Sequence, residues 1–507
     1  MKNKWVKVAA AVLIFAMLLW LSVQGSSSQL RKKVAQYKAQ LREAGEKTTV
    51  EEITPPPVSA EKNALALFQS VEPFLRSGGN DCIETNPPTG MHLISPGRAM
   101  VGFQQPQIRS SEGTNDWKDL RAALDRRGVV LDFLRELPSK DRLQFDLDYS
   151  QGLLLVLGHL MPLKRSSQVI RAAVLCDLHG GNTASAITNL HGGLSLVRLW
   201  NREPVLISQM IRISMLQIFY SVQWELLQAK DLSDSQLEVV QTDWERVDLL
   251  NSMEEAFVAK RVLGTLTIEQ YRTSNSPAGL FSSREGTSRK IVGWWENLKI
   301  SGRETRDGIN FALWKSSWSY DDQLCLYETE QMIVSALRQI RTNGFYKDAI
   351  AENERQMKTL TTMFRSDNRF RVWMTDSMGE IGASPEWENQ CLTKLMAAAV
   401  AKHLAITAIA LKRFKLKHNQ LPTHLDELAP DFLKAIPRDP VDGQPLRYHM
   451  NNDHSFTLYS IGENGIDDGG SATNAEASKS FSWQRGVDWV WPQPATAAEV
   501  EAFLLTH

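Results

Sequence analysis

The chain has few cysteines and no closely spaced cysteine pair, which excludes several classes of protein. Its 507 residues contain four cysteines: Cys82, Cys176, Cys325 and Cys391. Zinc ribbons and thiol–disulfide active sites need closely spaced cysteines, and a disulfide framework would be denser for a chain of this length. We therefore expect free thiols, with Cys176 and Cys325 buried in apolar helices.

The chain also lacks an excess of charge and lacks the motifs of the common enzyme classes. The formal net charge is -1, from 57 basic and 58 acidic side chains, so no overall field favours nucleic acid as a partner. The sequence contains no H-E-x-x-H, no G-x-S-x-G, no phosphate-binding P-loop and no dinucleotide-binding fingerprint. No catalytic residue is nominated, and a binding protein is favoured over an enzyme.

One long hydrophobic run lies at the N-terminus. Lys2, Lys4 and Lys7 precede the apolar residues 8–23, a run close to membrane-spanning length. The positive-inside rule places these lysines in the cytoplasm. We expect residues 1–25 to form a single-pass anchor in the inner membrane, with the body on the periplasmic side. The alternative is a signal peptide whose cleavage would give a secreted protein.

Residues 26–60 are expected to connect the anchor to the body. Four apolar residues recur at helical spacing: Leu30, Val34, Tyr37 and Leu41. Such a seam is typical of a coiled coil that pairs two anchors or of a solvated stalk helix, and the stalk is favoured because so short a seam rarely self-associates. The Pro-rich residues 48–60 predict a stiff extended spacer. The folded body is expected to begin near Glu61.

Residues 61–272 show helical periodicity with clear boundaries. The predicted helices cover 63–75, 152–163, 168–179, 183–200, 204–228, 236–250 and 254–271. Ser233 and Gln236 have the spacing of a capping box, and the residues 180–182 separate two helices. Residues 81–116 are rich in Pro and Gly and predict an irregular connector.

One helix pair in this region is similar to a tetratricopeptide-type helical hairpin. The pair 168–179 and 183–200 carries small and apolar residues at close-packing positions: Ala172, Ala173, Ala186, Leu190 and Leu194. The resemblance covers about one repeat, and no regular period continues, so the region predicts a helical-hairpin array without a regular superhelix. Such an array implies a protein-binding scaffold.

Residues 273–388 are unusually rich in tryptophan: Trp294, Trp295, Trp314, Trp318 and Trp373. Tryptophan beside polar residues can line a glycan or peptide groove, or the active site of an envelope hydrolase. Aromatic residues at helical spacing more often pack inward, so core packing is favoured. Helices are predicted over 320–343 and 349–363.

Residues 389–470 predict a long helix on a small antiparallel sheet. The helix covers 389–417, and its apolar part would suggest a second membrane span, but Lys402 and His403 fall within that part and favour a core helix. Leu421–Pro422 ends the connection, and Thr423 is predicted to cap a short turn that includes Asp426.

The end of this module predicts a hairpin. Residues 446–450 and 456–459 alternate apolar and polar residues around the turn 451–454, with Leu446, Tyr448, Phe456 and Leu458 facing the helix. Residues 471–507 follow as a C-terminal extension.

The order of these motifs resembles the globular domain of type II secretion pseudopilins, the major pseudopilin in particular. After the long helix, the matching residues are Leu421–Pro422, Asp426–Leu428, Phe432–Leu433, Ile436–Pro440, Gly443, Tyr448 and Leu458–Gly462, followed by an acidic Gly-rich loop. The resemblance implies that the loop binds calcium through oxygens of Ser460, Asn464, Asp467 and Asp468. Because the N-terminus lacks the Gly-Phe cleavage motif and the glutamate of pseudopilins, we expect a borrowed module.

Together these features predict a mainly α protein in which a helical-hairpin array precedes an α+β pseudopilin-like module. The expected function is that of a non-catalytic, membrane-anchored envelope protein whose array binds a protein or a glycan. The alternatives are a type II secretion-related component and an envelope hydrolase with its site in the Trp-rich region.

Overall fold

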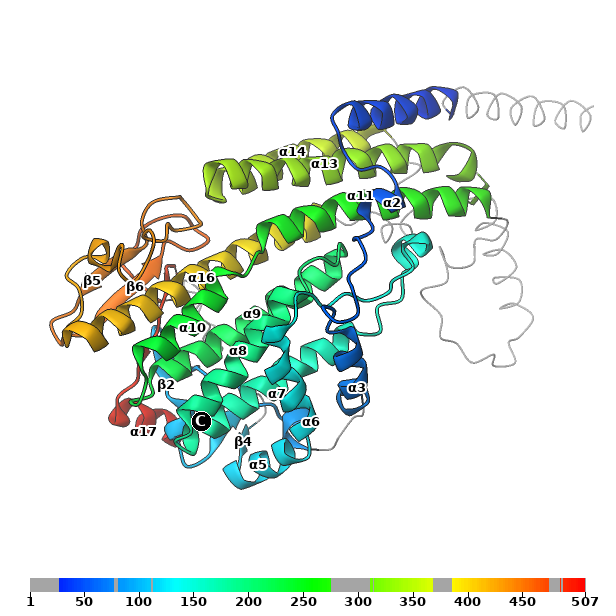
Figure 1. Cartoon of the computed structure of the whole chain (residues 1–507). Coiled ribbons are helices and arrows are strands. Elements are labelled where there is room, and N and C mark those ends of the chain that lie inside the picture. The colour runs from blue at the N-terminus through cyan, green and yellow to red at the C-terminus, as the bar shows by residue number, and fades with distance from the viewer. Residues whose placement is uncertain are drawn as a thin grey trace, which may run out of the picture.

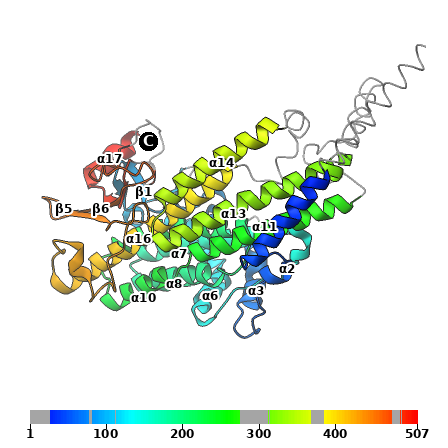
Figure 2. The ribbon, with the colours of Figure 1, turned by 90° about the horizontal axis from the view of Figure 1, so that it is seen from above.

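The protein is mainly helical, and its strands are short (Figures 1 and 2). The computed structural model describes residues 27–76, 81–110, 113–274, 311–312, 314–367, 385–473, 484 and 487–506. The predicted anchor and the residues Trp294, Trp295 and Trp373 lie outside this described part. The mainly α class predicted from the sequence is confirmed.

A packed array of helices builds the first part of the body. In chain order these helices are α3 (Leu65–Arg76), α5 (Trp117–Asp125), α6 (Gly128–Glu136), α7 (Leu160–His179), α8 (Thr183–Leu199), α9 (Leu206–Leu227), α10 (Asp234–Glu245) and α11 (Leu250–Thr273). The predicted capping box starts α10: the N–H of Gln236 donates to Ser233 Oγ at 3.3 Å, and the N–H of Ser233 donates to Gln236 Oε1 at 2.9 Å. α7 and α8 pack on each other across the turn 180–182, so they form a helical hairpin.

The predicted helix over 152–163 is wrong. Residues Tyr149–Leu154 form the 3₁₀ helix η3, and the chain then runs without helix until α7 begins. Gly152 has a φ of +62°, and a Cβ at this position would lie 2.2 Å from Thr267 Oγ1 of α11. The N–H of Leu153 donates to the same hydroxyl at 2.8 Å. Contact with α11 therefore overrides the local apolar pattern.

The helical body also includes α13 (Ser319–Asn343), α14 (Lys347–Asp367) and α16 (Pro385–His418). By length and composition α16 could cross a membrane, but 78% of its most apolar stretch is buried inside the protein. Lys402 on this helix donates to the carbonyls of Glu245 at 3.2 Å and Val247 at 2.7 Å. α16 is therefore the core helix that its internal charges predicted.

The residues expected to form a solvated stalk pack on the body instead. Val34, Tyr37 and Leu41 of the helix 27–43 contact Tyr327 of α13, and the rings of Tyr37 and Tyr327 stack with centroids 5.7 Å apart. The apolar stripe is thus covered by the same chain, so the stalk prediction is wrong. The apolar stripe is explained by this packing without any pairing between two anchors.

The expected extended spacer is also partly helical. It contains α2 (Val50–Ile53), which Thr49 and Glu52 begin with a capping box. Before α2, the buried carboxylate of Glu46 pairs with Arg261 of α11 at 3.1 Å and with Arg338 of α13. The folded body therefore includes residues 27–60, and Glu61 does not mark its beginning.

The segment 81–116, expected to be irregular, contains one short helix and two strand pairs. These elements are α4 (Cys82–Thr85), β1 (His92–Ser95) paired with β2 (Arg98–Met100), and β3 (Ile108–Ser110) paired with β4 (Gly113–Asn115). The C-terminal extension returns to this lobe: β8 (Gln493–Pro494) pairs parallel with β2, and Val500 of α17 (Ala497–Thr506) packs with Ile94 and Met100. Segments far apart in sequence therefore share one sheet.

The predicted C-terminal hairpin is present. β5 (Arg447–Met450) pairs with β6 (Phe456–Ser460), with Tyr448 opposite Leu458, and β7 (Trp489–Val490) adds to the other side of β6. α16 packs against β6, and the side chain of Leu458, on β6, is fully buried in the core. The similarity of this arrangement to a pseudopilin stays a prediction.

The cap predicted before this sheet lies one residue further on. His424, not Thr423, caps the 3₁₀ helix η5 (Leu425–Leu428), and the reciprocal acid is Glu427. The carboxylate of Glu427 accepts from the N–H groups of Thr423 at 2.6 Å and His424 at 3.0 Å. Beyond this turn, one continuous cluster of buried apolar side chains runs through the molecule, from Ile53 to Trp491.

Candidate functional site

Ser460, the first of the predicted calcium ligands, faces the interior. Its Oγ donates to Asp439 Oδ1 at 2.7 Å, and the second oxygen of Asp439 accepts from the N–H of Ile461 at 3.0 Å. Asp439 is fully buried, which raises the pKa of its carboxyl, and it pairs with Arg447 at 3.1 Å. A calcium ion would have to displace the hydrogen bond to Asp439 in order to reach Ser460.

The other three predicted ligands lie at the exposed end of the loop. Asn464 Nδ2 donates to Asp468 Oδ2 at 2.9 Å, and Asp467 Oδ2 lies 3.4 Å from Nε of Arg447. Desolvation alone would raise the pKa of Asp467. The hydrogen bond from the N–H of Gly469 and the positive charge of Arg447 outweigh this effect, so the pKa is lowered. The loop thus joins Asn464 to Asp468, turns Asp467 toward Arg447 and keeps Ser460 apart, and calcium binding stays a prediction.

Asp488 organises this loop, although the family motif did not nominate it. Its buried carboxylate accepts from the N–H groups of Asp468 at 3.4 Å, Gly470 at 2.8 Å and Ser471 at 3.1 Å. Burial raises the pKa of Asp488. Among the described residues, no group of three or more His, Cys, Asp or Glu side chains is placed to hold a metal ion. In this structure the carboxylate of Asp488 holds the loop through these backbone hydrogen bonds.

The tryptophans within the described part of the chain fill the core. Trp314 is 1% exposed, packs with Ile268 and Leu326, and donates from Nε1 to Asp322 at 2.7 Å. Trp318 is partly buried against the same cluster. The core interpretation is confirmed for these two residues, and they give no support to a glycan groove or a hydrolase site.

The cysteines are free thiols. Cys176 and Cys391 are buried, whereas Cys82 and Cys325 are half-buried. Burial raises the pKa of Cys325 and of Cys391 to about 12, so neither is a reactive thiolate at neutral pH. The prediction that these side chains serve packing is confirmed for Cys176, while Cys325 is less buried than expected.

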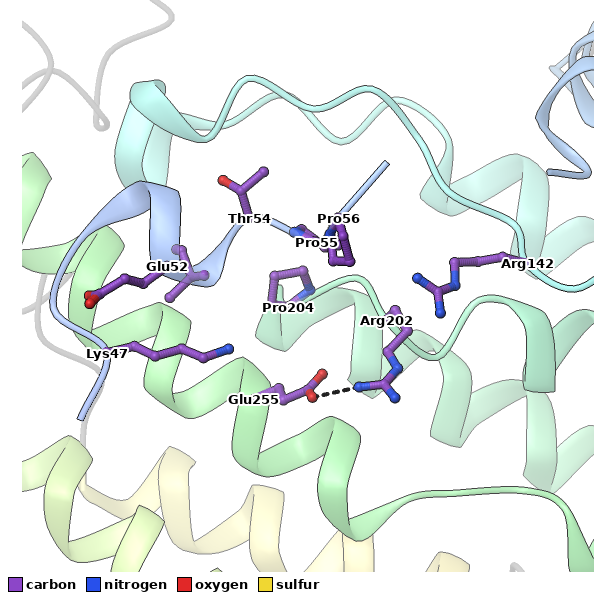
Figure 3. A pocket seen from close by; sticks show the side chains of 10 residues that line it. Lys47, Glu52, Thr54, Pro55, Pro56, Arg142, Arg202, Pro204 and Glu255 are labelled. Carbon is purple, nitrogen blue, oxygen red and sulfur yellow. Dashed lines mark hydrogen bonds and ion pairs between the residues drawn. The ribbon is translucent and has the colours of Figure 1, made fainter. Parts of the chain in front are cut away.

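A cavity of about 270 Å³ opens where residues 47–56 cross the helical body (Figure 3). Residues from several distant parts of the chain line it: Lys47, Glu52, Ile53, Thr54, Pro55, Pro56, Arg142, Arg202, Pro204 and Glu255. Figure 3 shows Lys47 and Arg142 extending toward the cavity from opposite sides. The cavity therefore joins the N-terminal segment, the turn between α8 and α9, and the start of α11.

The charges around the cavity are unevenly paired. Arg202 forms an ion pair with Glu255 at 2.9 Å, and Glu52 accepts from the N–H groups of Thr48 and Thr49 at the start of α2. Those two hydrogen bonds lower the pKa of Glu52, so this carboxylate is ionised and already engaged. Lys47 and Arg142 have no side-chain partner in the described part of the chain. The cavity thus presents two free cations.

A second polar cluster is buried between α11, α13 and α16. Lys260 Nζ pairs with Glu388 Oε1 at 2.6 Å and with Glu330, and both carboxylates are at most 1% exposed. Burial raises the pKa of Glu330, and the nearby charge of Glu388 raises it further, whereas the charge of Lys260 lowers it. The cluster is closed to solvent, and we interpret it as structural.

In comparisons with known proteins, no family model, no curated protein and no solved structure matches this chain. The resemblance to pseudopilins and to tetratricopeptide hairpins therefore rests on the residues alone. Sequence reasoning missed the cavity because Lys47, Arg142 and Arg202 are far apart in the chain and share no spacing. The run Pro55–Pro57 lies beside the cavity, but in the sequence it predicts an extended spacer.

Proposed function

We propose that this protein is a non-catalytic, membrane-anchored envelope protein that holds an acidic segment of a partner protein in the cavity of Figure 3. The single observation that carries the proposal is the pair of free cations, Lys47 and Arg142, on opposite sides of one cavity. Each would attract a carboxylate with roughly 1–4 kcal/mol, depending on how far the contact is shielded from water. Arg202 also lines the cavity, but its charge is paired with Glu255.

The lining favours a peptide over a glycan. Among the residues that the structure describes, no aromatic ring lines the cavity, whereas glycan sites usually stack a sugar on an aromatic face. Its apolar wall consists of Ile53, Pro55, Pro56 and Pro204, rigid residues that lose little entropy when a chain packs on them. A short acidic segment would place its carboxylates on Lys47 and Arg142 and its backbone against this wall.

The sequence and the fold together support a place at the membrane. The apolar run 8–23 follows three lysines, and the helix 27–43 follows that run and packs on α13. A body fixed to its anchor by such packing would hold the cavity at a constant position relative to the bilayer. We infer an inner-membrane protein whose body lies on the periplasmic side.

A second candidate function is that of a type II secretion-related component. The observation that favours it is the helix α16 packed against the predicted β5–β6 hairpin. The apolar surface of α16 is already buried by α9, α10 and the sheet, so the helix cannot stack into a filament as a pilin helix does. In this role the protein would be a partner of the secretion machinery and not a pilus subunit.

Capture of partners from solubilised membranes tests both candidates. The wild-type chain is compared with the double variant Lys47→Glu and Arg142→Glu, and with a matched control, Lys118→Glu and Lys394→Glu, which changes two exposed lysines elsewhere. We expect one set of partners to be lost in the cavity variant only, and to be lost at high salt as well. Equal capture by all three proteins would contradict the cavity as the site, and secretion-channel proteins among the lost partners would favour the second candidate.

A further inference from the structure

Several apolar side chains are exposed to solvent from the end of η3 to the first turn of α7. Leu154 is 60% exposed, Val156 is 76% exposed and Met161 is 54% exposed, and Leu153 is exposed beside them. Isolated exposed apolar residues are common, but four within nine residues are not, because each side chain left in water forgoes its burial energy. We call these four residues the apolar run.

The apolar run is held in place by α11. Gln270 Nε2 donates to the carbonyl of Ser150 at 2.8 Å, and the N–H of Leu153 donates to Thr267 Oγ1 at 2.8 Å. Gly152 allows this close approach by adopting a positive φ. The backbone of η3 is therefore fixed to the last turns of α11, and the exposed side chains have a defined direction.

The apolar run lies at the end of α11 where the chain emerges from the expected anchor. Glu46 pairs with Arg261, whereas Arg31 lies over the ring of Tyr320 at 5.0 Å, and Arg272 lies over the same ring at 3.8 Å. The helix 27–43 thus runs beside α11 in the opposite direction, and its first residues lie beside the end of α11. Figure 1 shows η3, drawn in cyan, below this part of α11.

Chain length limits how far this end can be from a bilayer. Between the last apolar residue of the anchor, Val23, and the helix at Ser27 there are four Cα steps, which span at most about 14 Å when extended. If residues 8–23 cross the membrane, the end of α11 must therefore lie near the lipid head groups.

Cationic side chains accompany the apolar run at this end. Lys32 and Lys33 of the helix 27–43 are exposed, and Arg76 lies beside Gly158, within 3.2 Å of the position a Cβ would take there. Arg76 is also paired with Glu72 at 2.8 Å, and Lys33 acts on Glu328 of α13, so these positive charges are partly compensated by the chain. Exposed apolar residues on the same side of a protein as cationic side chains are typical of surfaces that enter the head-group region of anionic bilayers.

We propose that the apolar run is a second membrane contact, which inserts Leu154 and Val156 into the lipid surface beside the anchor. The inference rests on the anchor in the proposed function, and it adds that the body lies against the bilayer. The cavity would then be held close to the membrane surface, which would restrict its partners to proteins that are themselves at the membrane.

Photo-crosslinking in a bilayer tests this proposal. The full chain is reconstituted into vesicles of phosphatidylcholine and phosphatidylglycerol, with a benzophenone side chain placed at Val156 or, as a control, at Val239 of α10, which is 43% exposed. Figure 1 places α10 away from the start of the helix 27–43. Flotation of the vesicles first shows whether the protein is anchored at all.

We expect lipid adducts from position 156 and none from position 239. A floating protein that gives no lipid adduct at position 156 would overturn the second contact while leaving the anchor intact. An adduct between position 156 and another peptide, from the same chain or from a second copy, would also overturn it, because protein would then cover the run. Failure to float would overturn the anchor and this inference with it.

Discussion

Replacing Lys260 by methionine is expected to lower the free energy of unfolding by about 3–5 kcal/mol, the usual cost of removing one partner from a buried ion pair. The ammonium group is 10% exposed and lies between Glu330 and Glu388, which are 0% and 1% exposed. Burial alone would lower the pKa of Lys260, but the two carboxylates raise it. Methionine has a similar length and leaves both acids buried without a counter-charge.

The same cluster predicts a pH dependence. The pKa of Glu330 is raised above its unfolded value, chiefly by burial, to about 8. A raised pKa means that the native state binds the proton more tightly, so the contribution is fully present below pH about 4.5 and is lost as the pH rises through about 8. Glu330→Gln should remove this slope, because glutamine stays neutral throughout.

Urea unfolding of the full chain in lipid nanodiscs, followed by tryptophan fluorescence, measures the change. The control is Lys394→Met, which removes an exposed lysine of α16 and should change the free energy by less than about 0.5 kcal/mol. The triple variant Lys260→Met, Glu330→Gln and Glu388→Gln should recover most of the loss, since no buried charge remains. A Lys260→Met protein within about 1 kcal/mol of the wild type would refute the reasoning.

Three further predictions concern other parts of the chain. Burial alone would raise the pKa of Glu46, but Arg338 and Arg261 lower it to about 2, so its contribution to stability is present above pH about 4.5 and lost as the pH falls through about 2. Glu46→Gln should therefore cost about 2 kcal/mol at pH 7 and flatten the acid limb of a plot of unfolding free energy against pH. An unchanged acid limb would count against the ion pairs. Leu458→Asp should destabilise the full chain by at least about 4 kcal/mol in urea titrations, since it buries a carboxylate in place of a fully buried side chain, and a stable variant would contradict the register of β6. Millimolar calcium should raise the melting temperature of the full chain if the acidic loop binds it, and Asp467→Asn with Asp468→Asn should abolish that shift; absence of a shift in the wild type would leave the loop as a turn held by the chain alone.

The sequence predicted those elements whose signals are local. Ser233 and Gln236 start α10, and Gly180 ends α7, because caps and glycines act on the neighbouring backbone. The hairpin β5–β6 followed from alternation over a short turn, and Lys402 correctly indicated that α16 is not a membrane span. In each case the sequence signal that supports the prediction lies within a few residues or within one element.

The failures have a tertiary cause. The residues 152–157 have the composition of a helix, but a hydroxyl of α11 takes the N–H of Leu153 and fixes η3 there. The stripe Val34–Leu41 is equally compatible with solvent, another chain or α13, and only the folded chain shows which partner covers it. The cavity is less predictable still, since Lys47 and Arg142 come together only when residues 47–56 fold back across the helices.

Photo-crosslinking from Thr54, an exposed residue at the wall of the cavity, tests the central claim most directly. A benzophenone side chain at this position, in the full chain in its native membrane, should capture one partner protein through an acidic segment. The account predicts that Arg142→Glu abolishes the adduct while the control Lys118→Glu leaves it unchanged. An adduct of equal yield in the Arg142→Glu protein, or no protein adduct at all, would contradict the claim that this cavity holds an acidic partner.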